Sequence, residues 1–305
     1  MSIELYKTHR PSTFKGIVGQ PQAVAMLKEM VENDRVPHAI LFSGESGCGK
    51  TTLARILKLK LNCSDHDFSE VNCADFRGID MVREIRQRMN LSPVGGVCRI
   101  WLIDEAHQLS SQAQNAFLKI LEDTPKHVYF FIATTDPMKL LSTIRTRCTE
   151  VKVKPLAPAT MKELLIAVAD KEGKTLTDEV VERITEYATG SARKALVLYN
   201  QIIGIEDPEE QLKAIESSDT KAKAIEIARA LMQKVPWSNV AKILKEVDEE
   251  PESIRRMVLG YASNVLLSAS KGNERAFLLL DVFQHPFYDS GKPGLVAACF
   301  AVCTR

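Results

Sequence analysis

The sequence lacks several features that mark large protein classes. Aromatic residues make up 6% of its 305 residues, which fits helical globular domains better than a β-sandwich. The formal net charge is +1, so a DNA-binding surface would have to be a local patch. Met1–Arg10 has no apolar signal region, and we find no stretch of the length and apolarity of a membrane span. We therefore predict a cytoplasmic protein with no membrane contact.

The cysteines argue against two further classes of protein, those with a disulfide framework and those with a thiolate zinc site. There are seven, an odd number, and none forms a C-x-x-C pair. Cys299 and Cys303 lie four apart in an apolar run, a spacing that fits buried thiols on a helix. A disulfide framework and a thiolate zinc site are both disfavoured, and we predict no zinc.

The first half of the chain alternates strand-like and helix-like segments. A chain of this length, 45% hydrophobic, can form two or three domains. Alternation of this kind predicts a parallel sheet with helices on both faces. The expected strands are Ala39–Ser43, Glu70–Asn72, Val97–Asp104, Val128–Thr134 and Thr149–Val153, and the expected helices are Thr51–Leu61, Ile79–Met89 and Ser110–Glu122.

Helical periodicity replaces the strand signals after Pro155. Three helices are predicted at Ala159–Lys171, Thr177–Ala188 and Ser191–Gly204, with Thr177 as a helix N-cap. A second break at Ile205–Pro208 precedes a remainder that is helical throughout. We therefore predict three domains: α/β over residues 1–156, small and helical over 157–207, and all-helical over 208–305.

The segment between the first strand and the first helix of the sheet domain carries a phosphate-binding motif. The pattern G-x-x-x-x-G-K-[ST] is complete in Gly44, Glu45, Ser46, Gly47, Cys48, Gly49, Lys50 and Thr51. Its glycines let backbone N–H groups face a phosphate, and the helix that follows, with Thr52 in its first turn, adds a positive dipole end. Lys50 supplies a charge to the terminal phosphates, and the Thr51 hydroxyl is a ligand for Mg²⁺. The motif predicts binding of a nucleoside triphosphate.

A second acidic element completes the expected site. Asp104 and Glu105 follow the apolar run that starts at Ile100, at the strand end where ligands bind in open α/β sheets. We expect Asp104 to hold Mg²⁺ through water and Glu105 to accept the proton of the attacking water. Together with His107 they spell the D-E-A-H box of a helicase class, but the helical second half offers no second ATPase lobe.

Across these motifs the sequence resembles the AAA+ ATPases of DNA clamp loaders. This family includes the gamma/tau subunit of bacterial DNA polymerase III and the small subunits of replication factor C. The resemblance runs from about Tyr6 to Gln201, and it is carried by Tyr6–Gln20, His38–Gly44, Leu118–Pro125, Ile132–Leu140, Thr143–Cys148 and Gly190–Leu196. It implies a P-loop AAA+ domain, a helical lid over 157–207 and an oligomerising collar over 208–305.

The resemblance also implies roles for residues outside the phosphate loop. The segment with Tyr6, Arg10, Pro11 and Val18 corresponds to the part of the family that wraps the adenine base. Thr135, with Thr134 as the adjacent alternative, corresponds to the sensor-1 residue that contacts the γ-phosphate or the water.

Two arginines match further positions of the family. Arg147, in a Thr-Arg-Cys version of the family's Ser-Arg-Cys motif, corresponds to the arginine that reaches the neighbouring subunit's ATP site. Arg193 corresponds to the sensor-2 arginine that touches the γ-phosphate from the lid, although a helix arginine can also simply pair with a carboxylate.

The sequence departs from the bacterial gamma subunit in two respects. It has no four-cysteine zinc module after the phosphate-loop helix, and it has no long C-terminal extension beyond Arg305. These differences suggest an archaeal-like or phage-encoded subunit.

The resemblance places DNA contacts at the starts of two helices. The candidates are Arg77, Ser111 and Gln112, and a solvated helix face is the alternative for the basic cluster around Arg77. The leading hypothesis is the ATPase subunit of a sliding-clamp loader that acts with ATP and Mg²⁺. Its partners would be the sliding clamp, the other loader subunits of a pentameric ring and primer–template DNA. The alternatives are another AAA+ DNA motor, such as a branch-migration ATPase, and a non-hydrolysing structural subunit of the loader.

Overall fold

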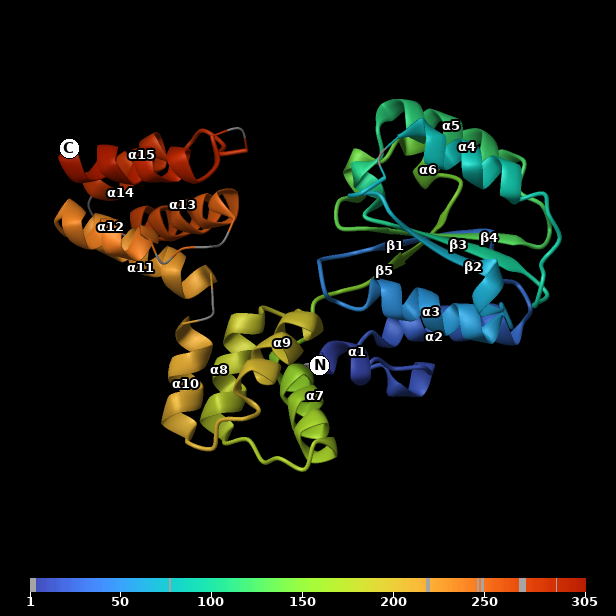
Figure 1. Cartoon of the computed structure of the whole chain (residues 1–305), viewed down its shortest axis with the longest axis horizontal. Helices are drawn as coiled ribbons and strands as arrows, with labels where there is room; N and C mark the ends of the chain where they lie inside the picture. Colours follow the sequence, from blue (N-terminus) through green and yellow to red (C-terminus); the bar gives the residue numbers. More distant parts are fainter. Residues whose placement is uncertain are drawn as a thin grey trace. The chain divides into compact units, whose positions relative to one another are not determined.

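A five-stranded parallel sheet organises the first part of the chain (Figure 1). The structure is a computed structural model that describes residues 4–76, 78–217, 220–245, 247, 250–268, 273–288 and 290–305. Its strands, in the spatial order β2-β3-β4-β1-β5, are β1 (Ala39–Ser43), β2 (Phe68–Asn72), β3 (Arg99–Asp104), β4 (Val128–Thr134) and β5 (Thr149–Lys152). All four neighbouring pairs are parallel, as the sequence pattern predicts.

Helices cover both faces of this sheet, because its central strands are apolar on both sides (Figure 1). All five residues of β1 are buried. One face packs against α2 (Pro21–Glu32) and α3 (Lys50–Lys60), and the other against α4 (Ile79–Arg88), α5 (Ser111–Glu122) and α6 (Ser142–Arg145).

Two strands have the predicted ends and three differ by one or two residues: β2 begins at Phe68 and not at Glu70, β5 ends at Lys152 and not at Val153, and the third difference is near Val97. The strand β3 begins at Arg99, and the Val97 side chain is 72% exposed. The turn before it is held by a buried carboxylate, because Asp67 accepts hydrogen bonds from the backbone N–H groups of Val94, Gly95 and Gly96. Apolarity alone therefore extends this strand too far.

Three helices follow the sheet in the same compact unit, which spans Met1–Ile203. They are α7 (Pro158–Lys171), α8 (Asp178–Ala188) and α9 (Ala192–Ile202), and the short N-terminal helix α1 (Leu5–Thr8) packs against α9. The Thr177 hydroxyl accepts a hydrogen bond from the backbone N–H of Val180, so the N-cap prediction is confirmed. Short 3₁₀ turns at Phe14–Gly16, Asp65–Asp67, Ala106–Gln108 and Pro137–Lys139 complete the unit.

A second compact unit, Gly204–Arg305, is helical in its described residues. Its helices are α10 (Pro208–Ser217), α11 (Thr220–Met232), α12 (Trp237–Lys245), α13 (Pro251–Ser268), α14 (Glu274–Val282) and α15 (Gly291–Thr304). Leu231, Leu279 and Phe283 are fully buried in its core. Cys299 is buried there and Cys303 is half-buried, on the helix that their spacing predicts. Among the described residues, no helix combines the length and the apolarity needed to cross a membrane.

Candidate nucleotide-binding site

The sheet topology brings three polar loops to one edge. The phosphate loop follows β1, Asp104 ends β3, and Thr134 ends β4, which lies between those two strands. Ser43 is the register partner of Thr134, and the backbone N–H of Gly44 donates to the Thr134 carbonyl at 3.2 Å. Since parallel strands end on the same side, the motifs that the sequence separates by up to 90 residues become neighbours.

The backbone of the phosphate loop requires glycine. Gly44 has a φ of 149°, and a Cβ atom there would lie 1.9 Å from the backbone carbonyl oxygen of Val153. Gly49 has a φ of 109° at the N-cap of α3, and a Cβ atom there would meet no atom within 4 Å. Space for a ligand therefore lies directly at the start of α3, where the first N–H groups of the helix have no intrahelical partner.

The Lys50 ammonium is held inside the same loop. Its side chain is buried, and its Nζ donates hydrogen bonds of 2.8 Å to the backbone carbonyls of Gly44 and Glu45. Burial lowers the pKa of Lys50, and the carboxylates of Glu105 and Asp104 oppose that shift. A buried cation next to an open anion-binding loop is suited to receive phosphate.

The hydroxyl of Thr51 and the carboxylate of Asp104 meet at this edge. Thr51 Oγ1 donates to Asp104 Oδ2 at 3.0 Å, and Asp104 Oδ1 accepts the backbone N–H of Glu105 at 2.9 Å. Hydroxyl, carboxylate and water oxygens are the ligand set that Mg²⁺ prefers, so the residues present fit this metal. Glu105 adopts the left-handed conformation, with a φ of 50°, and its side chain is 34% exposed.

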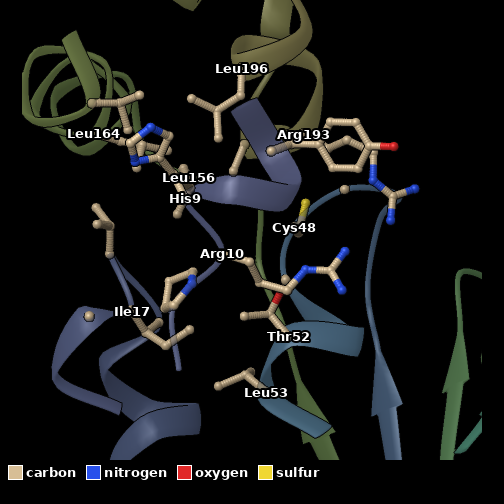
Figure 2. A pocket seen from close by; sticks show the side chains of 18 of the residues that line it. His9, Arg10, Ile17, Cys48, Thr52, Leu53, Leu156, Leu164, Arg193 and Leu196 are labelled. Carbon is tan, nitrogen blue, oxygen red and sulfur yellow. The ribbon is translucent and has the colours of Figure 1, made fainter. Parts of the chain in front are cut away.

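A cavity of 430 Å³ begins at the phosphate loop. Figure 2 shows His9, Arg10 and Ile17 from the N-terminal segment, Cys48 and Thr52 from the loop and helix α3, and Leu164, Arg193 and Leu196 from the helical part around it. The expected binding residues that line it are Tyr6, Arg10, Pro11, Val18, Gly47, Cys48, Gly49, Lys50, Thr51, Thr52 and Arg193. The volume falls in the usual range for a small-ligand pocket.

Sequence reasoning missed the part of the lining that comes from packing. Leu164, Val168 and Leu196 come from α7 and α9, and on those helices they read as ordinary core positions. His9 also lines the cavity, and its Nε2 lies 2.5 Å from Glu172 Oε1 at the end of α7. A pair of residues 163 positions apart leaves no local signal in the chain.

Two contacts join the helical part to the phosphate loop. The backbone N–H of Arg193 donates to the Gly47 carbonyl at 3.3 Å, and the Cys48 thiol lies 3.8 Å from the Gly190 carbonyl. The Arg193 guanidinium lies 5.7 Å from the centre of the Tyr6 ring. The expected sensor-2 arginine is thus brought to the cavity by the start of α9.

The threonines at the end of β4 face His107. Thr134 is fully buried, and its Oγ1 lies 3.2 Å from His107 Nδ1. The Thr135 Oγ1 lies 3.5 Å from the same nitrogen, and Glu105 Oε2 lies 3.4 Å from it. The sequence indicated the two threonines, while the position of His107 between them and Glu105 emerges from the fold.

The Arg147 side chain is exposed. It forms an ion pair with Glu122, and it donates to the backbone carbonyl of Thr143 at 3.0 Å. It is not among the described residues that line the cavity. An arginine outside its own subunit's site is compatible with action on another one.

The three expected DNA-contact residues differ in what the structure says of them. Ser111 and Gln112 are exposed at the start of α5, where the Ser110 side chain accepts the backbone N–H of Ala113 and caps the helix. Arg77 lies outside the described residues.

Comparisons with known proteins find sequence similarity to subunits of DNA polymerase III. A sequence profile described as DNA polymerase III, delta subunit, matches residues 19–81 and 72–157. DNA polymerase III subunit gamma/tau of Mycobacterium tuberculosis is 36% identical over 222 residues, covering 65% of this chain and 38% of that protein. DNA polymerase III subunit tau of Escherichia coli is 32% identical over 234 residues, covering 70% of this chain and 36% of that protein.

Solved structures show the fold. RuvB of Thermotoga maritima, described as a Holliday junction branch migration motor, superposes with a TM-score of 0.60 at 20% sequence identity. The match covers 77% of this chain and 85% of RuvB, so the chain has a RuvB-like AAA+ fold. The chain spans well under half the length of the two DNA polymerase III subunits that it matches. At 32–36% identity over about two thirds of its own residues, this chain is a homologue of the gamma/tau subunits of DNA polymerase III.

Proposed function

We propose that this chain is the ATPase subunit of a sliding-clamp loader, acting in the cytoplasm. The observation that carries the proposal is the pairing of Thr51 Oγ1 with Asp104 Oδ2 at 3.0 Å, which ties the acidic strand end to a residue that lines the cavity together with Lys50. This pairing joins the phosphate loop to the acidic strand end, and both residues lie within the segments that match the DNA polymerase III delta-subunit profile.

The residues of the site have separate tasks in ATP binding. The N-terminal segment with Tyr6 and Arg10 and the apolar side chains of Leu164 and Leu196 enclose the base. The N–H groups from Gly47 to Thr52 receive the phosphates, and Lys50 turns from its own loop carbonyls to the terminal phosphates. Thr51 and Asp104 would hold Mg²⁺, which would supply positive charge to offset that of the phosphates.

Hydrolysis uses groups at the ends of β3 and β4 and two arginines. Glu105 accepts the proton of the attacking water, and Thr135 or Thr134 holds that water or the γ-phosphate. Arg193 touches the γ-phosphate from the helical lid over 157–207. Arg147 reaches the ATP site of the next subunit, so the chain by itself is a poor ATPase.

The partners follow from this arrangement. The all-helical region over 208–305 serves as a collar that joins the subunits into a pentameric ring. ATP binding closes the ring on an open clamp, and primer–template DNA, contacted at Arg77, Ser111 and Gln112, triggers hydrolysis and release. Zinc has no part in this proposal, and its absence stays a prediction.

The test is an ATPase assay of the complex that is isolated through a tag on this chain. Turnover is measured without additions, with primed DNA alone, and with primed DNA plus the clamp, and Lys50→Ala complexes give the background. Stimulation by clamp and DNA together is the expected result. Stimulation by DNA alone to the same level identifies a DNA motor instead, and no turnover in any mixture identifies a non-hydrolysing subunit.

A further inference from the structure

The side chain of Glu105 needs a partner to hold its carboxylate in one place. Its backbone is fixed in the left-handed region, which few residues other than glycine adopt. Its side chain, however, has three rotatable bonds and is 34% exposed. A general base acts only when its carboxylate lies within hydrogen-bond reach of the water that it deprotonates.

His107 provides a contact of this kind. It lies on the turn Ala106–Gln108 directly after Glu105, and its ring is 10% exposed. Its Nδ1 lies 3.4 Å from Glu105 Oε2 and 3.2 Å from Thr134 Oγ1. One ring nitrogen therefore faces both the expected general base and the end of the neighbouring strand.

The other ring nitrogen determines which hydrogen atom His107 carries. The Gln108 amide nitrogen lies 3.2 Å from His107 Nε2. An amide nitrogen only donates hydrogen bonds, so Nε2 accepts, and the neutral ring carries its hydrogen on Nδ1. His107 then donates from Nδ1 to Thr134 Oγ1 at 3.2 Å, and Glu105 Oε2 lies 3.4 Å from the same nitrogen.

Thr134 holds the His107 ring in place. Its side chain is fully buried, and its hydroxyl also accepts the backbone N–H of Asp136 at 3.1 Å. Its carbonyl accepts the N–H of Gly44, the first residue of the phosphate loop. Glu105 is therefore connected through His107 to the end of β4, and the same strand end contacts the phosphate loop.

We propose that His107 is a positioning residue that holds the Glu105 carboxylate toward the γ-phosphate, acting through the hydrogen on Nδ1. The proposal rests on the proposed function, because it presumes that Glu105 is the general base. It gives the histidine of the Asp-Glu-Ala-His segment a role in the ATPase site itself, without a helicase lobe.

Two substitutions of His107 distinguish the roles of its two ring nitrogens. In His107→Asn the side-chain amide reaches the place of Nδ1, whereas in His107→Gln it reaches the place of Nε2. In the tagged complex with clamp and primed DNA, we expect His107→Gln to lower kcat at least about tenfold while KM stays within about twofold. We expect His107→Asn to keep kcat within about threefold of the wild-type value, because a donor remains beside Glu105.

A double substitution gives a readout that a merely structural role would not produce. Glu105→Gln alone should be slow, and adding His107→Gln should slow it no further, because the two residues act on one step. Thermal unfolding of each variant checks that the fold is kept. Wild-type kcat in His107→Gln, His107→Asn as slow as His107→Gln, or an additive double variant would overturn the proposal.

These outcomes are separable from failure of the proposed function. A complex in which Glu105→Gln is slow but His107→Gln is fast loses the positioning role and keeps the ATPase. A wild-type complex without turnover overturns both.

Discussion

Both compact units of the chain bury charged side chains, and Lys50 and Glu252 are satisfied in different ways. Lys50, in the first unit, is 6% exposed, and its described hydrogen bonds go to two carbonyls of its own loop. Glu252, in the second unit, is 4% exposed and accepts from the guanidinium groups of Arg255 and Arg256 and from the backbone N–H of Phe287. One charge is held by neutral groups of a single loop, and the other by two cations of its own helix α13 and by one backbone N–H from a distant segment.

The difference separates a binding site from a structural one. Burial lowers the pKa of Lys50, so the fold stabilises its ammonium less well than water does. Hydrogen bonding from Arg255 lowers the pKa of Glu252 to about 2, so that carboxylate is stabilised by the fold as it stands. A charged group with few partners in the protein can still bind a ligand. A charged group whose partners are all supplied by the protein contributes to stability.

The largest expected effect concerns a charge that belongs to neither class. Arg147 is exposed and paired with Glu122, and we propose that it serves the next subunit. In the tagged complex with clamp and DNA, Arg147→Ala should lower kcat about 10³-fold, because an arginine supplied in trans stabilises the transition-state charge.

The matched control is its partner. Glu122→Gln removes the ion pair and leaves the arginine, so turnover should stay near the wild-type rate. Wild-type turnover in Arg147→Ala would exclude the shared site while leaving nucleotide binding untouched.

The next largest effect tests the structural charge. Glu252→Gln leaves Arg255 buried without its carboxylate, and removal of one partner of a buried ion pair should destabilise the second unit by about 3 kcal/mol. Urea unfolding followed by the fluorescence of Trp237, in this unit, gives the free energy of unfolding. Glu250→Gln, an exposed neighbour, is the control that should change little.

Low pH should remove the difference in stability between the wild type and Glu252→Gln. The direction of this change follows from the pKa of Glu252. The folded-state pKa of Glu252 is depressed from 4.5 to about 2, so its stabilisation is present above pH 4.5 and is lost as the pH falls toward 2. The gap between wild type and Glu252→Gln should therefore shrink over that window. A gap that is the same at pH 3 and pH 7 would show that the carboxylate charge is not what stabilises the unit.

The third prediction tests Lys50, the charged group that we expect to bind a ligand. Lys50→Ala should weaken ATP binding by about 2 kcal/mol, or about 30-fold, through loss of a charge-assisted contact to phosphate. Without nucleotide, its unfolding midpoint should stay close to that of the wild type, because burial disfavours the charged ammonium. Titration calorimetry and thermal unfolding measure the two effects, with the exposed Lys60→Ala on the same helix as control. A large loss of stability without nucleotide would place Lys50 with Glu252 as a structural charge.

Features carried by a continuous stretch of sequence could be predicted. The apolar run Ala39–Ser43 became β1 with the same ends, because a strand buried on both faces has no polar positions to interrupt it. The N-cap at Thr177 was also predicted, since capping is a contact between residues three apart. Neither feature depends on how distant segments pack.

Features made by distant segments could not be predicted. His9 meets Glu172 across 163 positions, and Glu252 meets the backbone of Phe287 across 35. No local pattern marks such pairs, because the same residues are common on solvated surfaces. His107 shows the same limit, since its contact with Thr134 depends on the order of the strands in the sheet.

The smallest expected effect concerns the edge of the binding site. Arg193 is exposed, lies over the Tyr6 ring and lines the cavity beside the phosphate loop. If its guanidinium reaches the γ-phosphate, Arg193→Ala should weaken ATP binding about tenfold and ADP binding by less than about twofold. Titration of both nucleotides into the variant measures the ratio, and Lys194→Ala, the next cation on α9, is the control. Equal losses for ATP and ADP would mean that Arg193 supports the Tyr6 side of the pocket and not the terminal phosphate. The ratio of the ATP and ADP losses thus decides between two roles for Arg193. It either binds the ligand, as we propose for Lys50, or contributes to the structure, as Glu252 does.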